Sequence, residues 1–156
     1  MSSIVSSSAE DTQRIGSRLG QELAGGDVIG LRGELGAGKT CLVQGIARGL
    51  GVDPSIPVTS PTFTLVGEYP GRLMLRHADF YRVESYARLE DAGFDDLLDP
   101  DAVLVVEWPE RFPQALPAER LEIRIALVSD SERRFEVEGK GARAAELARR
   151  FLERCP

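Results

Sequence analysis

The stretch that decides the fold begins with Val28-Ile29-Gly30-Leu31 and continues, after one arginine, with Gly33-Glu34-Leu35-Gly36-Ala37-Gly38-Lys39-Thr40. The octet fits the pattern G-x-x-x-x-G-K-[ST], in which backbone N–H groups surround the phosphates of a nucleotide. The apolar run before the octet is typical of a short buried strand, and apolar residues recur at helical spacing over positions 42–50 after it. This order of strand, glycine-rich loop and helix predicts a phosphate-binding loop, or P-loop, in an α/β fold.

The residue types of the octet suit this chemistry. Small residues let the backbone of positions 35–40 approach a β-phosphate, and the N-terminus of the following helix adds the positive end of its dipole. Lys39 would reach the β- and γ-phosphate oxygens, and the Thr40 hydroxyl would hold Mg²⁺. Of 19 basic residues only Lys39 and Lys140 are lysines, which strengthens this interpretation. The expected ligands are ATP and Mg²⁺, and the expected loop contacts are Leu35, Gly36, Ala37, Gly38, Lys39 and Thr40.

The rest of the chain alternates helical and strand patterns. Helices are expected over about 9–24, 42–50, 84–92 and 142–152, strands over 102–107, 121–127 and 135–138, and a β-hairpin over 63–69 and 73–77. The apolar run Ala102 to Val106 is typical of a central strand in a parallel sheet. We therefore expect a three-layer P-loop NTPase fold with a mixed, mostly parallel central sheet, β-hairpin additions and flanking helices. Residues 1–8 are rich in serine and are expected to form a flexible tail before a single domain over 9–156.

Composition narrows the function classes. The chain has 156 residues, of which 42% are hydrophobic and 28% charged, as in an ordinary globular domain. The longest apolar run has far fewer residues than the roughly 20 that a membrane helix needs. A net charge of −6 disfavours strong direct binding to nucleic acid. Cys41 and Cys155 have no metal-ligand spacing and predict no disulfide framework, so we expect a reducing, cytoplasmic location and no membrane.

Two acidic residues are candidates to complete a nucleotide site. P-loop proteins place an acid near the end of a neighbouring strand, where it organises Mg²⁺ or the attacking water. Glu107 follows the apolar run over 102–106 and is directly followed by Trp108. Asp79 lies in His77-Ala78-Asp79-Phe80-Tyr81-Arg82, where extended geometry would put His77, Asp79 and Tyr81 on one face. Which of the two acids positions water is left open.

Four motifs in order connect the chain to a known family. They are the octet over 33–40, Thr59-Ser60-Pro61-Thr62-Phe63-Thr64-Leu65-Val66, the stretch from His77 to Arg82, and Val106-Glu107-Trp108-Pro109. With these motifs the sequence closely resembles the TsaE family, formerly called YjeE. The resemblance implies a Mg²⁺-dependent ATPase, weak on its own, that is required to make threonylcarbamoyladenosine beside the anticodon of tRNAs reading codons that begin with A. It also implies action on a TsaB–TsaD heterodimer, with ATP hydrolysis resetting that complex between rounds.

The resemblance also implies roles for single residues. Lys39 and the loop backbone match the phosphate cradle, Thr40 and Glu107 match the Mg²⁺ site, and Asp79 matches an acid implicated in hydrolysis. Trp108 is similar to a tryptophan beside the nucleotide, and residues 59–64 resemble a switch region near the γ-phosphate. Three residues are expected on the adenine side: Ala9, Thr12 and Ser131. The chain departs from the family pattern at Cys41, where Thr or Ser is usual, and at Ser131-Glu132-Arg133, where Gly-Arg is typical.

Two other functions fit the same loop. A small-molecule or nucleotide kinase would need an arginine-bearing lid, for which Arg72, Arg76, Arg82 and Arg88 are available. A non-catalytic module would use ATP only to order a switch. A GTPase is excluded, because the guanine-reading motif N-K-x-D needs asparagine and the chain has none.

Overall fold

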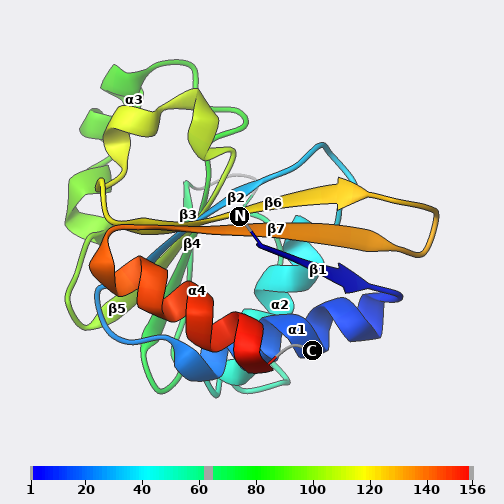
Figure 1. Ribbon diagram of the computed structural model, residues 1–156. Helices are drawn as coiled ribbons and strands as arrows, with labels where there is room; N and C mark the ends of the chain where they lie inside the picture. Colours follow the sequence, from blue (N-terminus) through cyan, green and yellow to red (C-terminus); the bar gives the residue numbers. More distant parts are fainter. Residues whose placement is uncertain (1, 62–64, 155–156) are drawn as a thin grey trace.

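The computed structural model describes residues 2–61 and 65–154. Its seven-stranded sheet has the order β1-β7-β6-β2-β5-β4-β3 (Figure 1). The strands are β1 (Ser2–Ser6), β2 (Val28–Arg32), β3 (Val66–Tyr69), β4 (Met74–Asp79), β5 (Ala102–Glu107), β6 (Arg120–Leu127) and β7 (Arg133–Lys140). The central strands β6, β2, β5 and β4 run parallel, whereas β1, β7 and β3 are antiparallel additions at the two sides.

Helices cover both faces of the sheet. They are α1 (Ala9–Glu22), α2 (Lys39–Gly49), α3 (Tyr86–Asp91) and α4 (Ala142–Arg154), with short 3₁₀ turns η1 (Phe94–Leu97), η2 (Pro109–Arg111) and η3 (Pro113–Ala115). One apolar core joins α1, α2 and α4 to the sheet, and a second core joins α3 and the 3₁₀ turns to the opposite face (Figure 1). Every residue of β5 is buried, as expected for a strand covered on both sides. The expected three-layer α/β fold is confirmed.

The start of the chain corrects one expectation. Ser2–Ser6, expected within a flexible tail over residues 1–8, form β1 and pair antiparallel with β7. The physical reason is that side chains alternate between the two faces of a strand, and here every second one from Ile4 onward is buried. Ile4 points into the core with 8% of its surface exposed, and Ser6 is also buried. The Ser6 hydroxyl lies 2.6 Å from that of Thr12 and donates to the Ser8 carbonyl, so its burial is compensated.

The junction between β1 and α1 is capped by side chains. The Ser8 hydroxyl accepts a hydrogen bond from the Asp11 amide, as an N-cap residue should. The Asp11 carboxylate in turn accepts from the Ser7 amide, one residue before the usual capping-box position. The hydrogen bond from the Arg14 side chain, followed by that from the Ser7 amide, holds the pKa of Asp11 below its ordinary value.

Helices α1 and α2 pack backbone to backbone through four glycines. Gly16 and Gly20 on α1 face Gly45 and Gly49 on α2. A Cβ atom on Gly16 would lie 2.5 Å from the Leu42 carbonyl oxygen, which leaves no room for a side chain. The pattern of small residues four apart therefore fixes α2, and with it the loop that precedes α2, against the rest of the fold.

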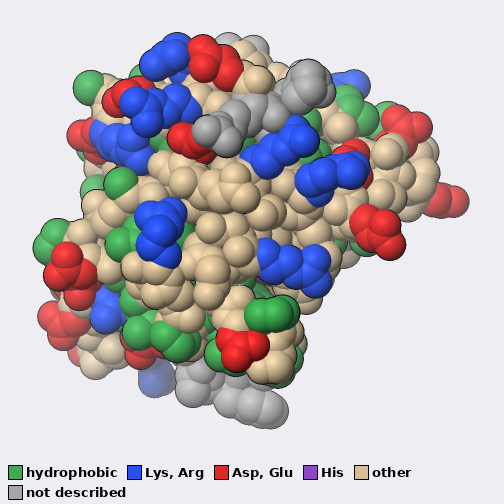
Figure 2. Space-filling view, turned by 90° about the horizontal axis from the view of Figure 1, so that it is seen from below, with side chains coloured by type: hydrophobic (Ala, Val, Ile, Leu, Met, Phe, Trp, Pro, Cys, Tyr) green, Lys and Arg blue, Asp and Glu red, His purple; other side chains and the backbone are tan. Residues whose placement is uncertain are grey.

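The surface around the helices carries charges of both signs. Viewed from below Figure 1, basic side chains lie across the face, some of them next to one another, and most acidic side chains lie toward its edges (Figure 2). On α4, Arg149 pairs with Glu153 and Arg150 with Glu146. Within the described residues, no helix has the length and apolar character needed to cross a membrane.

Candidate functional site

A cavity of about 650 Å³ opens at the carboxyl ends of β2, β4 and β5, where the loop before α2 begins. It is lined by Leu35, Gly36, Gly38, Lys39, Thr40, Ser60, Pro61, Leu65, Asp79, Tyr81, Arg82, Val83, Glu107 and Trp108. Open α/β sheets bind ligands in this position, outside the carboxyl ends of parallel strands. Eight of the sequence-predicted site residues thus come together: Leu35, Gly36, Gly38, Lys39, Thr40, Asp79, Glu107 and Trp108.

The glycine loop turns tightly and presents the start of α2 to the cavity. Gly36 and Gly38 have φ angles of +81° and +105°, a conformation that residues with a side chain rarely adopt. Helix α2 starts at Lys39, and within the described residues no side chain caps its N-terminus. Its first backbone N–H groups are therefore available to an anion, with the helix dipole in support.

Lys39 lies folded into the loop with 5% of its surface exposed. Its Nζ donates hydrogen bonds to the carbonyl oxygens of Gly33 and, at 3.1 Å, Glu34. Burial lowers the pKa of Lys39, while the carboxylates of Glu107 and Asp79 act in the opposite direction. The ammonium group lies beside the position where phosphate oxygens would bind, and its present partners are neutral carbonyls that a phosphate could replace.

The two acidic candidates lie side by side on neighbouring parallel strands. Asp79 ends β4 and Glu107 ends β5, and the two are direct partners in the strand register. Burial raises the pKa of Asp79, although the hydrogen bond from the Tyr81 amide to Asp79 Oδ1, at 2.8 Å, acts against that rise. Glu107 is more deeply buried, with 3% of its surface exposed. The sheet therefore places one half-buried and one buried carboxylate at the cavity.

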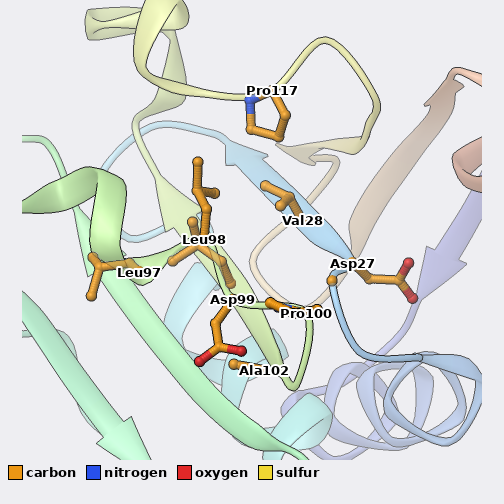
Figure 3. A pocket seen from close by; sticks show the side chains of 10 residues that line it. Asp27, Val28, Leu97, Leu98, Asp99, Pro100, Ala102 and Pro117 are labelled. Carbon is orange, nitrogen blue, oxygen red and sulfur yellow. The ribbon is translucent and has the colours of Figure 1, made fainter.

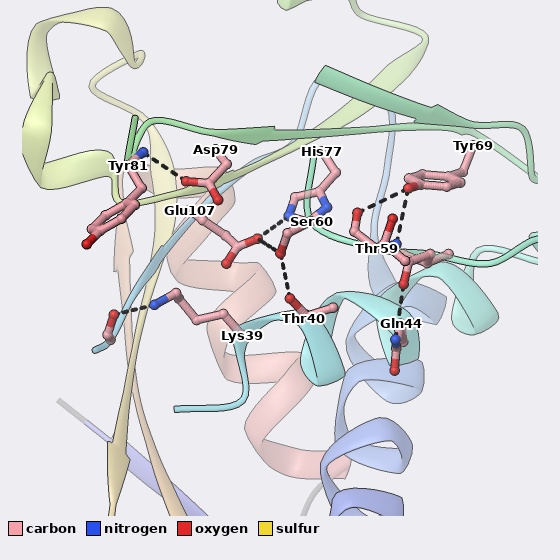
Figure 4. A network of polar contacts seen from close by, with 12 residues as sticks. Lys39, Thr40, Gln44, Thr59, Ser60, Tyr69, His77, Asp79, Tyr81 and Glu107 are labelled. Atoms are coloured by element: carbon pink, nitrogen blue, oxygen red, sulfur yellow. Dashed lines mark hydrogen bonds and ion pairs between the residues drawn. The ribbon is translucent and has the colours of Figure 1, made fainter. Parts of the chain in front are cut away.

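A chain of polar contacts links α2 to Glu107, at the end of β5, and to His77 in β4 (Figure 4). The Thr40 hydroxyl lies 2.7 Å from that of Ser60, and the Ser60 hydroxyl donates to Glu107 Oε2 at 3.3 Å. His77 Nε2 lies 2.6 Å from the same carboxylate oxygen. Hydroxyl and carboxylate oxygens are the donors that Mg²⁺ prefers, so Thr40 and Glu107, with Ser60 between them, fit the expected metal.

Trp108 closes one side of the cavity in a strained backbone conformation. It is the one residue other than glycine with positive φ, at 59°, within the part of the chain that the structure describes. Lys39 Nζ lies 4.4 Å from the centre of its ring, and the Tyr81 ring lies 4.9 Å away. Such strain persists where the surroundings impose it, often at functional sites. The aromatic pair forms an apolar wall beside Lys39.

Four predicted contacts do not line the cavity. Ala37 is buried under the loop, and its carbonyl accepts a hydrogen bond from Arg133 Nε at 3.0 Å. The Ala9 carbonyl accepts from the Cys41 thiol beside the start of α2, and the Thr12 hydroxyl is engaged with Ser6. Ser131 is exposed in the turn between β6 and β7. Contacts of Ala9, Thr12 and Ser131 with a base stay predictions.

The described residues do not include part of the expected switch segment, namely Thr62, Phe63 and Thr64. They also do not include Cys155. Ser60 and Pro61 from the same segment do line the cavity.

Sequence reasoning assigned no individual role in the ATPase site to three residues, one of which, Arg82, it considered only for the lid of the kinase alternative. Ser60 appeared only as part of a motif, yet its hydroxyl joins Thr40 to Glu107. Arg82 lines the cavity directly after Tyr81. Arg133 ties the loop to the β6–β7 turn, where it also donates to the Ser129 carbonyl. The polar residue types within the motifs were a signal for the first two, whereas the contact of Arg133 depends on a fold that places residues 37 and 133 together.

A second, smaller hollow lies at the opposite end of the same strands (Figure 3). Its volume is about 250 Å³, and it is lined by residues such as Val28, Leu97, Leu98 and Ala102, with Asp27 at its side. Asp27 is already paired with Arg143, the Nη2 to Oδ2 distance being 2.8 Å. The hollow is mainly apolar and is remote from the glycine loop, so the larger cavity is the candidate site.

Known proteins resemble the chain over most of its length. The family model described as "Threonylcarbamoyl adenosine biosynthesis protein TsaE" matches residues 6–135. The tRNA threonylcarbamoyladenosine biosynthesis protein TsaE of Treponema pallidum is 44% identical over 133 residues, which cover 85% of this chain and 97% of the relative. The protein of the same name from Bacillus subtilis is 41% identical over 135 residues, covering 86% of this chain and 83% of the relative. A crystal structure of Bacillus subtilis YdiB matches with a TM-score of 0.81 and 32% identity, covering 98% of this chain and 95% of that chain. The sequence motifs, the fold and these matches agree, and the chain belongs to the TsaE family.

Proposed function

We propose that this protein is a Mg²⁺-dependent ATPase that acts in the biosynthesis of threonylcarbamoyladenosine on tRNA. Membership of the TsaE family supports the place in tRNA modification. The observation that carries the ATPase is the convergence of Lys39, Thr40, Asp79 and Glu107 on one cavity at the start of α2. A structural role alone would not require a buried lysine and two carboxylates at the same strand ends.

Phosphate binding is assigned to the loop and Lys39. The N–H groups at the start of α2 would receive the β-phosphate, and Lys39 Nζ would exchange the Gly33 and Glu34 carbonyls for phosphate oxygens. Thr40 and Glu107 would hold Mg²⁺, which when bound neutralises charge that develops on the phosphates. In this arrangement the protein mainly positions the γ-phosphate and stabilises its charge.

Proton acceptance from the attacking water is assigned to Asp79. Burial raises its pKa, and a base whose pKa lies nearer to neutrality is better matched to this task. The Tyr81 amide holds Oδ1, so the carboxylate is oriented before substrate arrives. Glu107 is engaged by His77 and Ser60, which suits a fixed metal-side ligand better than a base. Water then adds to the γ-phosphorus as the bond to ADP breaks, giving ADP and phosphate.

The kinase alternative receives little support from the arginines proposed for its lid. Arg82 lines the cavity. Arg72 instead donates to the carbonyls of Gly20 and Leu23, and Arg76 pairs with Glu68. Arg88 lies 3.9 Å from Glu84 on the surface. These contacts do not assemble an arginine-bearing lid over the site, and hydrolysis is the better proposal.

The expected partner is the TsaB–TsaD heterodimer, in the cytoplasm where tRNA is modified. The net charge of −6 and the mixed signs of the surface in Figure 2 favour a protein partner over direct binding to RNA phosphates. ATP hydrolysis would then serve to reset that complex between rounds of modification.

The experiment measures Mg²⁺-dependent ATP hydrolysis by the purified chain, alone and with its own TsaB–TsaD complex. We expect slow hydrolysis alone, an increase with the partners, and loss of both in Lys39→Ala. Indifference to the partners would contradict the assigned role. Faster consumption of ATP with a nucleoside or nucleotide acceptor than with water would favour the kinase.

A further inference from the structure

We infer that His77 is a positioning residue that holds the Glu107 carboxylate in the orientation needed for Mg²⁺ binding. The inference rests on the proposed function, in which Glu107 is a metal-side ligand. It adds a residue that lies behind the site and lines no part of the cavity.

His77 reaches Glu107 from a neighbouring strand. On β4, His77 pairs in register with Val105 of β5, two residues before Glu107. Its side chain is 0% exposed and that of Glu107 is 4% exposed, while Nε2 and Oε2 are 2.6 Å apart (Figure 4). Because both side chains are buried and stand on paired parallel strands inside the sheet, neither can move away without disturbing the packing around it.

The hydrogen-bonding pattern shows what a histidine contributes here. A carboxylate oxygen accepts hydrogen bonds, so Nε2 is the protonated ring nitrogen and donates a hydrogen bond to Glu107 Oε2. The other ring nitrogen, Nδ1, is buried and has no hydrogen-bond partner among the described residues. Leu75, two residues earlier on β4, belongs to the apolar core. An apolar side chain at position 77 would fill this space without leaving a buried ring nitrogen unpaired, and an unpaired buried nitrogen lowers stability. Among the described residues, the bond to Glu107 is therefore the contact that requires histidine.

This bond leaves one carboxylate oxygen for a ligand. His77 Nε2 and the Ser60 hydroxyl both engage Oε2, so within the described residues Oε1 remains available. Residues that orient a metal ligand in this way typically change metal affinity or activity by about 10–100-fold when replaced. Loss of His77 should therefore weaken Mg²⁺ binding to the nucleotide complex while leaving the phosphate contacts of Lys39 in place.

The test compares His77→Leu with His77→Gln, whose amide nitrogen can donate from about the same reach. Leu75→Ala on the same strand serves as a control for loss of buried packing, because Leu75 is 0% exposed and belongs to the apolar core. Three quantities are measured: ATP affinity in EDTA, Mn²⁺ affinity of the ATP complex by electron paramagnetic resonance, and the Mg²⁺ concentration that half-activates hydrolysis.

We expect His77→Leu to weaken Mn²⁺ binding and raise the half-activating Mg²⁺ concentration by at least 10-fold, with metal-free ATP affinity changed less than 2-fold. His77→Gln should recover most of both losses, and Leu75→Ala should lower stability without changing either metal value. Unchanged metal values in His77→Leu, or no recovery in His77→Gln, would overturn the inference. If His77→Leu does not fold, His77→Asn replaces it, because its shorter amide does not reach Oε2.

Failure of the proposed function is separately visible in the wild-type protein. If the wild type binds Mn²⁺–ATP but hydrolyses nothing, the ATPase proposal fails, and the Mn²⁺ comparison still decides the role of His77. If the wild type binds no Mn²⁺–ATP, both proposals fail.

Discussion

At the contact between α1 and α2, replacing a glycine by alanine has two opposing effects on stability: tighter packing and higher helix propensity. In Gly16→Ala, the new Cβ would lie 2.5 Å from the Leu42 carbonyl oxygen and 3.0 Å from both Gly45 Cα and Ile46 N. Nonbonded carbon contacts settle near 3.5 Å, so the helices would have to separate by about 1 Å. Helix propensity alone favours alanine over glycine by about 1 kcal/mol.

Packing should outweigh propensity at this position. Over-packing typically costs 1–3 kcal/mol, and separating the helices also loosens Leu19 and Leu42, which are both 0% exposed. We expect a net loss of about 2 kcal/mol in the free energy of unfolding, which for a chain of this length lowers the melting temperature by roughly 4–8 °C. Urea denaturation followed by circular dichroism measures the loss. Arg14→Ala, on the exposed side of α1, is the control and should change stability far less, because an exposed ion pair such as that of Arg14 with Asp11 contributes little. A Gly16→Ala protein as stable as the wild type, or more stable, would refute the reasoning.

Lys39→Ala should reduce ATP affinity by about 10–100-fold in calorimetry, because a charge-assisted hydrogen bond contributes about 1.5–3 kcal/mol. The variant should keep its fold, since among the described residues Nζ bonds only two loop carbonyls. Unfolding of the variant would contradict this prediction. Burial raises the pKa of Asp79 above 3.8, so the folded protein binds a proton at this carboxylate more readily than the unfolded chain does. The free energy of unfolding therefore falls as the pH rises from 3.8 through the raised pKa of the folded state. Asp79→Asn should therefore be more stable than the wild type at pH 7 in thermal melts, and this difference in stability should disappear below pH 3.8. Equal stability at pH 7 would argue against a cost of burying the Asp79 carboxylate. Ser6→Ala leaves the buried Thr12 hydroxyl short of a partner and should cost about 1–3 kcal/mol in urea denaturation, whereas a neutral effect would mean that β1 adds little. Arg133→Ala removes the bond to the Ala37 carbonyl and should weaken ATP binding about 10-fold without lowering stability comparably, which calorimetry and melts together can check.

Much of the fold could be predicted because its signals are local. The strand, glycine loop and helix around Lys39 depend on residues adjacent in sequence, and the buried run at β5 has one periodicity. The start of the chain could not be predicted in this way. Ile4 and Ser6 form too short an alternation, and β1 exists because β7, more than a hundred residues later, offers an edge with which to pair.

The same distinction holds for the site. Lys39, Thr40, Asp79 and Glu107 could be proposed from motifs, and the structure brings them to one cavity. The contact of His77 with Glu107 depends on the register between β4 and β5, which the sequence of neither strand determines. The left-handed backbone of Trp108 was equally hidden, because nothing in its residue type favours a positive φ.

The most direct test of the central claim is hydrolysis of ATP by wild type and Asp79→Asn in a single turnover, with and without Mg²⁺. We predict that both proteins bind ATP, that the wild type releases phosphate only with Mg²⁺, and that Asp79→Asn releases it at least 100-fold more slowly, a loss at the lower end of what a positioned base contributes. Equal rates in the two proteins, or phosphate release by the wild type without Mg²⁺, would contradict the account.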